Sequence, residues 1–181
     1  MTSSASLRAS PSEKLLFLTE TVLAEAALLC ITDGRLFAQP MTAERADSLK
    51  LDHDLAERVD AFVARFGRLQ DTVGDKLLPA VLSWLAEPVG PAIDNLARAE
   101  RLGWLQSAAI WMECRQLRNF MIHEYVRDSV VLAAALCRGH ETVPLLVTTA
   151  QALADVVRSS SAGEGAINRS STSLAGTAPD C

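Results

Sequence analysis

The chain has 181 residues, of which 49% are hydrophobic and 22% are charged, and its formal net charge at pH 7 is −5. This length allows one domain with a sizeable core, and the negative balance excludes a generally basic surface that would hold nucleic acid or anionic lipid by charge alone. Alanine and leucine dominate, and hairpin signals such as Asn-Gly are almost absent, so we expect an all-α fold.

The cysteines and the N-terminal residues bear on where the protein resides. The four cysteines lie far apart, with no C-x-x-C pair and no metal-ligand spacing. The N-terminal residues lack an apolar segment of signal-peptide length, and the longest apolar stretches look too short or too interrupted to cross a bilayer. We therefore expect a soluble, reduced, cytoplasmic protein with no membrane contact, no metal and no cofactor.

The first third of the chain predicts two helices. Residues 1–12 are rich in Ser and Ala, and we expect them to be disordered. A first helix is predicted from Glu13 to about Ile31, followed by a break at Gly34 and Pro40. A second helix is predicted from about Thr42 to Leu69, because Leu, Val and Phe recur there at steps of three and four residues.

Shorter helices are predicted in the middle of the chain. The sequence from 71 to 87 continues as helix, with a kink around Gly74 and Pro79, until the turn "EPVGP". Residues 92–103 form a short helix that Gly103 ends.

The C-terminal part predicts a long helix over 104–128, an apolar helix closed by Gly139, and a last helix with Pro144 in its first turn. The low-complexity tail, 159–181, is expected to be disordered. Short connections between helices favour an antiparallel bundle of about five helices, forming one domain over 13–158.

The stretch "RQLRNFMIHEYVRD" gathers polar groups on one half of the long helix. An α-helix turns about 100° per residue, so Tyr125, Arg118, Arg115, Asn119 and His123 fall in that order within one half of its circumference. His123 lies one turn after Asn119, whose amide can fix the imidazole tautomer. The opposite arc is expected to face the core and carries Ile110, Cys114, Leu117, Phe120 and Met121.

Arginine, asparagine and histidine on one surface are suited to cleaving the phosphodiester bond of RNA. The 2′-hydroxyl attacks its own phosphate once a base of near-neutral pKa removes its proton, and His123 is such a base. A forked guanidinium stabilises the developing negative charge, which is the role expected for Arg118. DNA lacks the 2′-hydroxyl, so this chemistry would select RNA.

The segment "RNFMIHEY", residues 118–125, resembles the R-x4-H-x-Y motif of HEPN domains, in the branch that pairs with minimal nucleotidyltransferases. Residues 62–82 and 92–104 look like other recurrent segments of that branch, and the resemblance spans about Leu55 to Ala150.

The resemblance implies a homodimeric helical bundle that places the active sites of two protomers in one cleft. It implies the toxin of a type VII-like toxin–antitoxin pair, a metal-independent endoribonuclease with catalytic Arg118 and His123, supported by Asn119 and Arg115. The nucleotidyltransferase would act as antitoxin by adenylylating Tyr125, which adds phosphate charge and bulk beside Arg118.

Two alternatives remain open at this point. In the first, the chain is a catalytically inactive binding partner, or substrate-binding subunit, of a nucleotidyltransferase. In the second, it is a structural helical domain whose polar cluster lines a dimer interface. RNA cleavage separates the enzyme from both alternatives, whereas binding to a nucleotidyltransferase does not.

Overall fold

The computed structural model describes the backbone of residues 11–123 and 128–172 and the side chains of residues 12–121 and 128–160. Every regular element within these ranges is helical, which confirms the all-α prediction. The elements are α1 (Pro11–Leu36), α2 (Ala43–Asp47), the 3₁₀-helix η1 (Ser48–Lys50), α3 (His53–Asp71), the π-helix η2 (Thr72–Leu77), α4 (Leu78–Trp84), α5 (Ala92–Arg101), α6 (Ala108–His123) and α7 (Ser129–Thr172).

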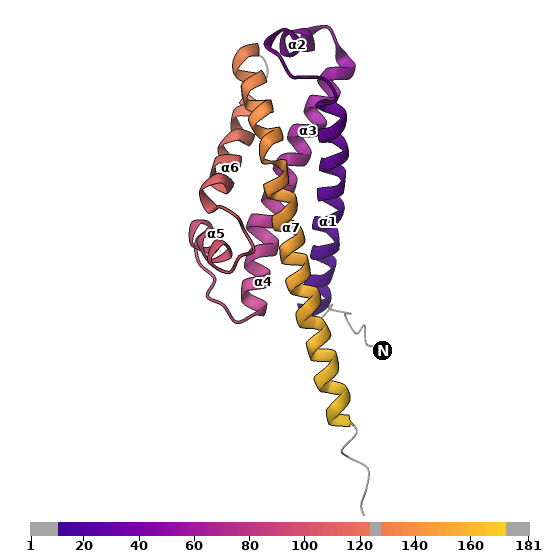
Figure 1. Ribbon diagram of the computed structural model, residues 1–181, viewed down its shortest axis with the longest axis vertical. Helices are drawn as coiled ribbons and strands as arrows, with labels where there is room; N and C mark the ends of the chain where they lie inside the picture. Colours follow the sequence, from indigo (N-terminus) through magenta and orange to yellow (C-terminus); the bar gives the residue numbers. More distant parts are fainter. Residues whose placement is uncertain (1–10, 124–127, 173–181) are drawn as a thin grey trace, which may run out of the picture.

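The long elements alternate in direction along one axis (Figure 1). α1 runs away from the N-terminus, α3 returns through η2 into α4, α6 runs back, and α7 returns along the whole bundle. α1 packs on α3 and α7, and α6 packs on the other side of the same two helices. α2 caps one end, while α5 lies beside α4 and α6 near the other.

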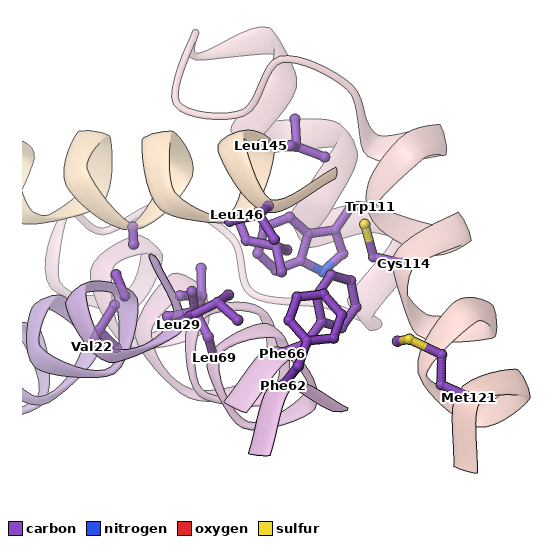
Figure 2. Packing of buried hydrophobic residues seen from close by; sticks show 14 of the residues in the cluster. Val22, Leu29, Phe62, Phe66, Leu69, Trp111, Cys114, Met121, Leu145 and Leu146 are labelled. Carbon is purple, nitrogen blue, oxygen red and sulfur yellow. The ribbon is translucent and has the colours of Figure 1, made fainter. Parts of the chain in front are cut away.

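The core follows the apolar periodicity of α3. Leu55, Val59, Phe62, Phe66 and Leu69 are each at most 4% exposed, as their three- and four-residue spacing predicted. Their face meets apolar side chains from α1, α6 and α7, and in Figure 2 the Trp111 indole lies among these, close to Leu146.

Two predicted helix ends were wrong, because glycine and proline do not end the helices there. α1 continues through Gly34 to Leu36, and α7 continues through both Gly139 and Pro144. A Cβ on Gly139 would lie 3.4 Å from both Met121 Sδ and a ring carbon of Phe62, so this glycine allows a close helix approach. Burial along the bundle thus outweighs the local preference of these residues to break a helix.

Other helix boundaries also differ from the predicted ones. The helix expected over 42–69 is interrupted between η1 and α3, where Asp52 caps α3 by accepting a hydrogen bond from the Leu55 amide at 2.9 Å. The kink expected around Gly74 is the π-helix η2, inside a continuous helical path. Gly103, at φ +76°, follows α5 as predicted, and α6 begins at Ala108 rather than at 104.

The C-terminal helix is longer than predicted. α7 runs to Thr172, past the expected end near residue 158. The expected disorder of residues 1–12 and 159–181, and with it the domain limits 13–158, stays a prediction.

The expectation about apolar length was also wrong. Two helices of the described chain, Ser12–Leu36 and Ser129–Ser160, are long and apolar enough to cross a membrane, judged by length and composition. The most apolar windows of these helices are 33% and 50% buried inside the bundle, respectively. Buried core helices of soluble proteins pass the same test, so this finding favours neither a membrane nor the cytoplasm.

An ion pair on the surface joins α6 to α7. Arg138 donates from Nε and Nη2 to the two carboxylate oxygens of Glu113, at 2.8 and 2.9 Å. These hydrogen bonds lower the pKa of the Glu113 carboxyl below its ordinary value. The pair thus links α6, the helix of the candidate site, to α7.

Candidate active site on α6

Two arginines of α6 face the α3–η2 segment. Arg115 Nη2 lies 2.7 Å from Asp75 Oδ2, and Arg118 Nη2 lies 3.4 Å from Asp71 Oδ2. The arginines are three residues apart on α6 and the aspartates four residues apart on α3 and η2, so each pair occupies neighbouring turns. The two elements therefore hold a row of two guanidinium groups beside two carboxylates.

Glycines on α3 and η2 make room for the large side chains of α6. A Cβ on Gly67 would lie 2.8 Å from Arg118 Nε and 3.1 Å from its Cγ. A Cβ on Gly74 would lie 3.0 Å from Trp111 Nε1. Since real Cβ contacts are longer, these two glycines let Arg118 and Trp111 lie directly on the neighbouring backbone.

The two ion pairs orient the arginines more than they stabilise the fold. The side chains of Arg118 and Asp71 are 38% and 36% exposed, and those of Arg115 and Asp75 are 31% and 40% exposed. Pairs this exposed contribute about 0–1 kcal/mol because water screens them. The Arg118–Asp71 separation also exceeds a normal N–H···O hydrogen bond. A phosphate can therefore bind the guanidinium of Arg118 without a large loss of stability.

The structure places the remaining predicted site residues only in part. Asn119 lies on α6 with an exposed side chain, next to Arg118. His123 is the last residue of α6, but its side chain lies outside the described part of the structure. Tyr125 also lies outside the described residues. Arg115 and Arg118 are thus brought together, whereas the positions of the imidazole and phenol stay predictions.

One assignment on the apolar arc of α6 was wrong. Cys114 and Met121 are fully buried, and Ile110 and Leu117 are partly buried, as expected. Phe120 is 54% exposed, because α6 lies at the edge of the bundle and no described element covers that part of its surface.

Sequence reasoning missed the carboxylates opposite the arginines. Asp71 and Asp75 stand four residues apart, so they lie on one face of a helix, and Gly67 and Gly74 share that face at a spacing of seven. Small residues and acids repeating on one face of this amphipathic helix would have indicated the contact surface. The polar side of α6 is therefore a helix–helix contact with an exposed rim.

Buried polar groups lie close to this contact. Gln70 is 1% exposed, and within the described structure neither its Oε1 nor its Nε2 has a hydrogen-bond partner. The indole Nε1 of Trp111, which lies against Gly74, has none either. Both groups flank the π-helix η2, and π-helical turns occur frequently at functional sites.

Comparisons with known proteins identify no family for this chain. No family model matches it, and neither a curated protein nor a solved structure matches it. The resemblance to HEPN domains therefore rests on the sequence segments alone. Among the described residues, no group of three or more His, Cys, Asp or Glu side chains is arranged to hold a metal ion.

The close contact at Gly67 gives a prediction that separates activity from stability. A Gly67→Ala substitution forces the flexible Arg118 side chain to move, while alanine favours the helix by about 0.5–1 kcal/mol over glycine. We expect an unchanged or slightly raised melting temperature. Under the RNA cleavage by Arg118 that the resemblance implies, cleavage should fall about 10-fold or more, because misplacing a catalytic group by about 1 Å can cost about 100-fold.

Gly34→Ala is the matched control for this substitution. Gly34 also lies inside a helix, and a Cβ there would meet no atom within 4 Å. It should raise the melting temperature to a similar extent and leave cleavage unchanged. Equal cleavage by the two variants would contradict a role for the Arg118 position.

Proposed function

We propose that this chain is the toxin of a HEPN/nucleotidyltransferase toxin–antitoxin pair and acts in the cytoplasm as a homodimeric, metal-independent endoribonuclease. Arg118 and His123 are its catalytic residues, and Arg115 and Asn119 support them. The antitoxin is a nucleotidyltransferase that adenylylates Tyr125.

The reaction is an internal transfer of the RNA phosphate. His123 takes the proton of the 2′-hydroxyl, and the 2′-oxygen forms a bond to the adjacent phosphorus. The bond from phosphorus to the 5′-oxygen breaks, and that oxygen takes a proton from water, to which His123 then releases the proton it accepted; the products are a 2′,3′-cyclic phosphate and a 5′-hydroxyl end. Arg118 stabilises the charge that develops on the non-bridging oxygens.

The observation that best supports this proposal is the pair of oriented guanidinium groups on α6. Asp71 and Asp75 hold Arg118 and Arg115 side by side, while about a third of each arginine side chain remains exposed. Groups held in place before the substrate binds cost little reorganisation during the reaction, which is what stabilisation of a transition state requires.

An RNA cleavage assay in excess chelator tests the proposal. We expect cleavage to persist in chelator and to leave 2′,3′-cyclic phosphate ends. The same oligonucleotide with a 2′-deoxy sugar at the cleaved position should stay intact there. Products with 3′-hydroxyl ends, or cleavage of the deoxy substrate, would contradict the mechanism.

A second candidate function is a catalytically inactive binding partner of a nucleotidyltransferase that presents Tyr125 for modification. The observation that favours it is the Arg118–Asp71 pair, because a guanidinium beside a carboxylate has less net charge to offer a phosphate. Under this alternative the chain accepts an adenylyl group on Tyr125 and cleaves no RNA. Adenylylation of Tyr125 in a chain that cleaves no RNA before the modification would therefore favour the binding partner.

A further inference from the structure

The outer face of α1 carries an apolar stripe that no described element covers. Phe17 is 72% exposed, Leu28 46% and Ile31 57%, and the side chains of Ala24 and Ala27 between them are also exposed. At about 100° per residue these five positions fall within an arc of about 100°. α1 packs on α3 and α7 through its other side, so the stripe points away from α6 (Figure 1).

A stripe of this kind on the outer face of a helical bundle indicates a contact surface. α1 cannot leave the bundle to cross a bilayer without uncovering the apolar faces of α3 and α7 on which it packs. Charged residues also interrupt the outer face, with Glu13 and Glu20 in its N-terminal half and Arg35 in the last turn. A partner must therefore lie flat on the stripe and match apolar groups that stand beside acid in the N-terminal half and base at the C-terminal end.

We propose that this partner is the α1 helix of a second copy of the chain, packed antiparallel and crossing at Ala24. Ala24 lies seven residues from both Phe17 and Ile31, so an antiparallel crossing there puts Phe17 of each copy against Ile31 of the other. Two small Ala24 side chains meet at the centre, where the helices approach most closely.

The charges select the antiparallel direction. Glu13 and Arg35 each lie eleven residues from Ala24, so the antiparallel crossing sets them opposite each other at both ends of the contact. A parallel pair would instead place acid beside acid and base beside base. Opposite charges at the rim of an interface fix its register, even where each pair contributes little energy.

The area of the stripe sets the strength of this contact. The 26 residues of α1 span about 39 Å, and a helix is about 10–12 Å wide, so two copies would cover roughly 800–950 Å² in total. Stable interfaces usually bury about 1,200–2,000 Å². We therefore expect a weak dimer that dissociates in the micromolar range. This contact is separate from the cleft dimer of the proposed ribonuclease and does not depend on it.

Disulfide cross-linking tests the geometry directly. Helix axes about 8–10 Å apart, with Cα atoms about 2.3 Å from each axis, bring two residues at the crossing to about 4–5 Å, which a disulfide can bridge. In the full chain with Cys30 and Cys181 replaced by serine, Ala24→Cys should form a disulfide dimer on mild oxidation. Phe17→Cys should not pair with itself, but should cross-link to Ile31→Cys when the two variants are mixed.

Controls separate this contact from random collision and from a parallel pair. Lys14→Cys lies on the same helix with an exposed side chain but off the stripe, so it should form no disulfide-linked dimer on oxidation. Failure of Ala24→Cys to cross-link, or equal cross-linking by Lys14→Cys, would overturn the proposal. Efficient self-pairing of Phe17→Cys would overturn the antiparallel direction.

Exchanging the charges of Arg35 and Glu13 gives a second test, in the chain that keeps its natural cysteines. In sedimentation equilibrium, Arg35→Glu should weaken self-association several-fold, and adding Glu13→Arg should restore it.

A wild-type chain that stays monomeric at hundreds of micromolar and floats with anionic lipid vesicles would show that the stripe meets a membrane, against the proposal. RNA cleavage should be the same for Arg35→Glu as for wild type, so a chain that cross-links but cleaves nothing would overturn only the proposed function.

Discussion

Replacing His123 by alanine is expected to reduce RNA cleavage by about 100- to 10,000-fold, because a positioned general base contributes about that much to proton transfer. His123 is the last residue of α6, and alanine is compatible with a helix there, so we expect the substitution to leave the melting temperature almost unchanged. Initial rates on one labelled RNA in excess chelator, together with a thermal melt, measure both effects.

Two further measurements test the roles of His123 and Arg118: the pH dependence of cleavage, and the activity of a control arginine variant outside the site. Wild-type activity should rise with pH through the ordinary imidazole range near about 6.5, since the base must be unprotonated, and His123→Ala should lose this rise. Arg118→Ala should reduce the rate of RNA cleavage by about 100- to 1,000-fold, because the guanidinium no longer stabilises the charge of the transition state. Arg101→Ala, an exposed arginine at the end of α5, should cleave as wild type. Undiminished cleavage by His123→Ala would exclude the assignment of the base.

Replacing Trp111 by alanine is expected to lower the free energy of unfolding by about 3–5 kcal/mol, the largest effect on stability that we predict. The indole is 0% exposed and packs directly against Gly74, so its removal leaves a cavity between α6 and the α3–η2 segment. In a domain of this size the melting temperature should fall by about 6–20 °C. Urea unfolding followed by circular dichroism measures the change.

Two variants on the same helix show whether the loss of buried side-chain volume causes the loss of stability. Phe120→Ala removes an aromatic side chain that is 54% exposed, and it should change stability by less than about 0.5 kcal/mol. Trp111→Phe keeps most of the volume and removes an N–H that has no hydrogen-bond partner in the described structure, so it should cost less than Trp111→Ala. Equal losses for the two aromatic-to-alanine variants would mean that burial in α6 has been misassigned.

Local rules failed where packing overrides a residue's own preference. Gly34 and Gly139 predicted helix ends, and Pro144 predicted the first turn of a new helix, yet all three lie inside helices. Glycine and proline disfavour a helix through their own conformational preferences. Inside a helix, glycine costs about 1 kcal/mol and proline about 3 kcal/mol relative to alanine. A helix that buries one side along the entire bundle gains more than this, and the chain continues through these residues.

The sequence by itself determined the features that depend on short-range periodicity. The three- and four-residue spacing of Leu, Val and Phe predicted the buried face of α3, and the same geometry put Arg115 and Arg118 on one side of α6. The left-handed turn after α5 followed from Gly103. Only the tertiary structure decided what that side of α6 touches. A helical wheel separates polar from apolar faces but does not name the neighbouring element, and the pairing with Asp71 and Asp75 depends on residues 40 or more positions away, joined by the path of the whole chain.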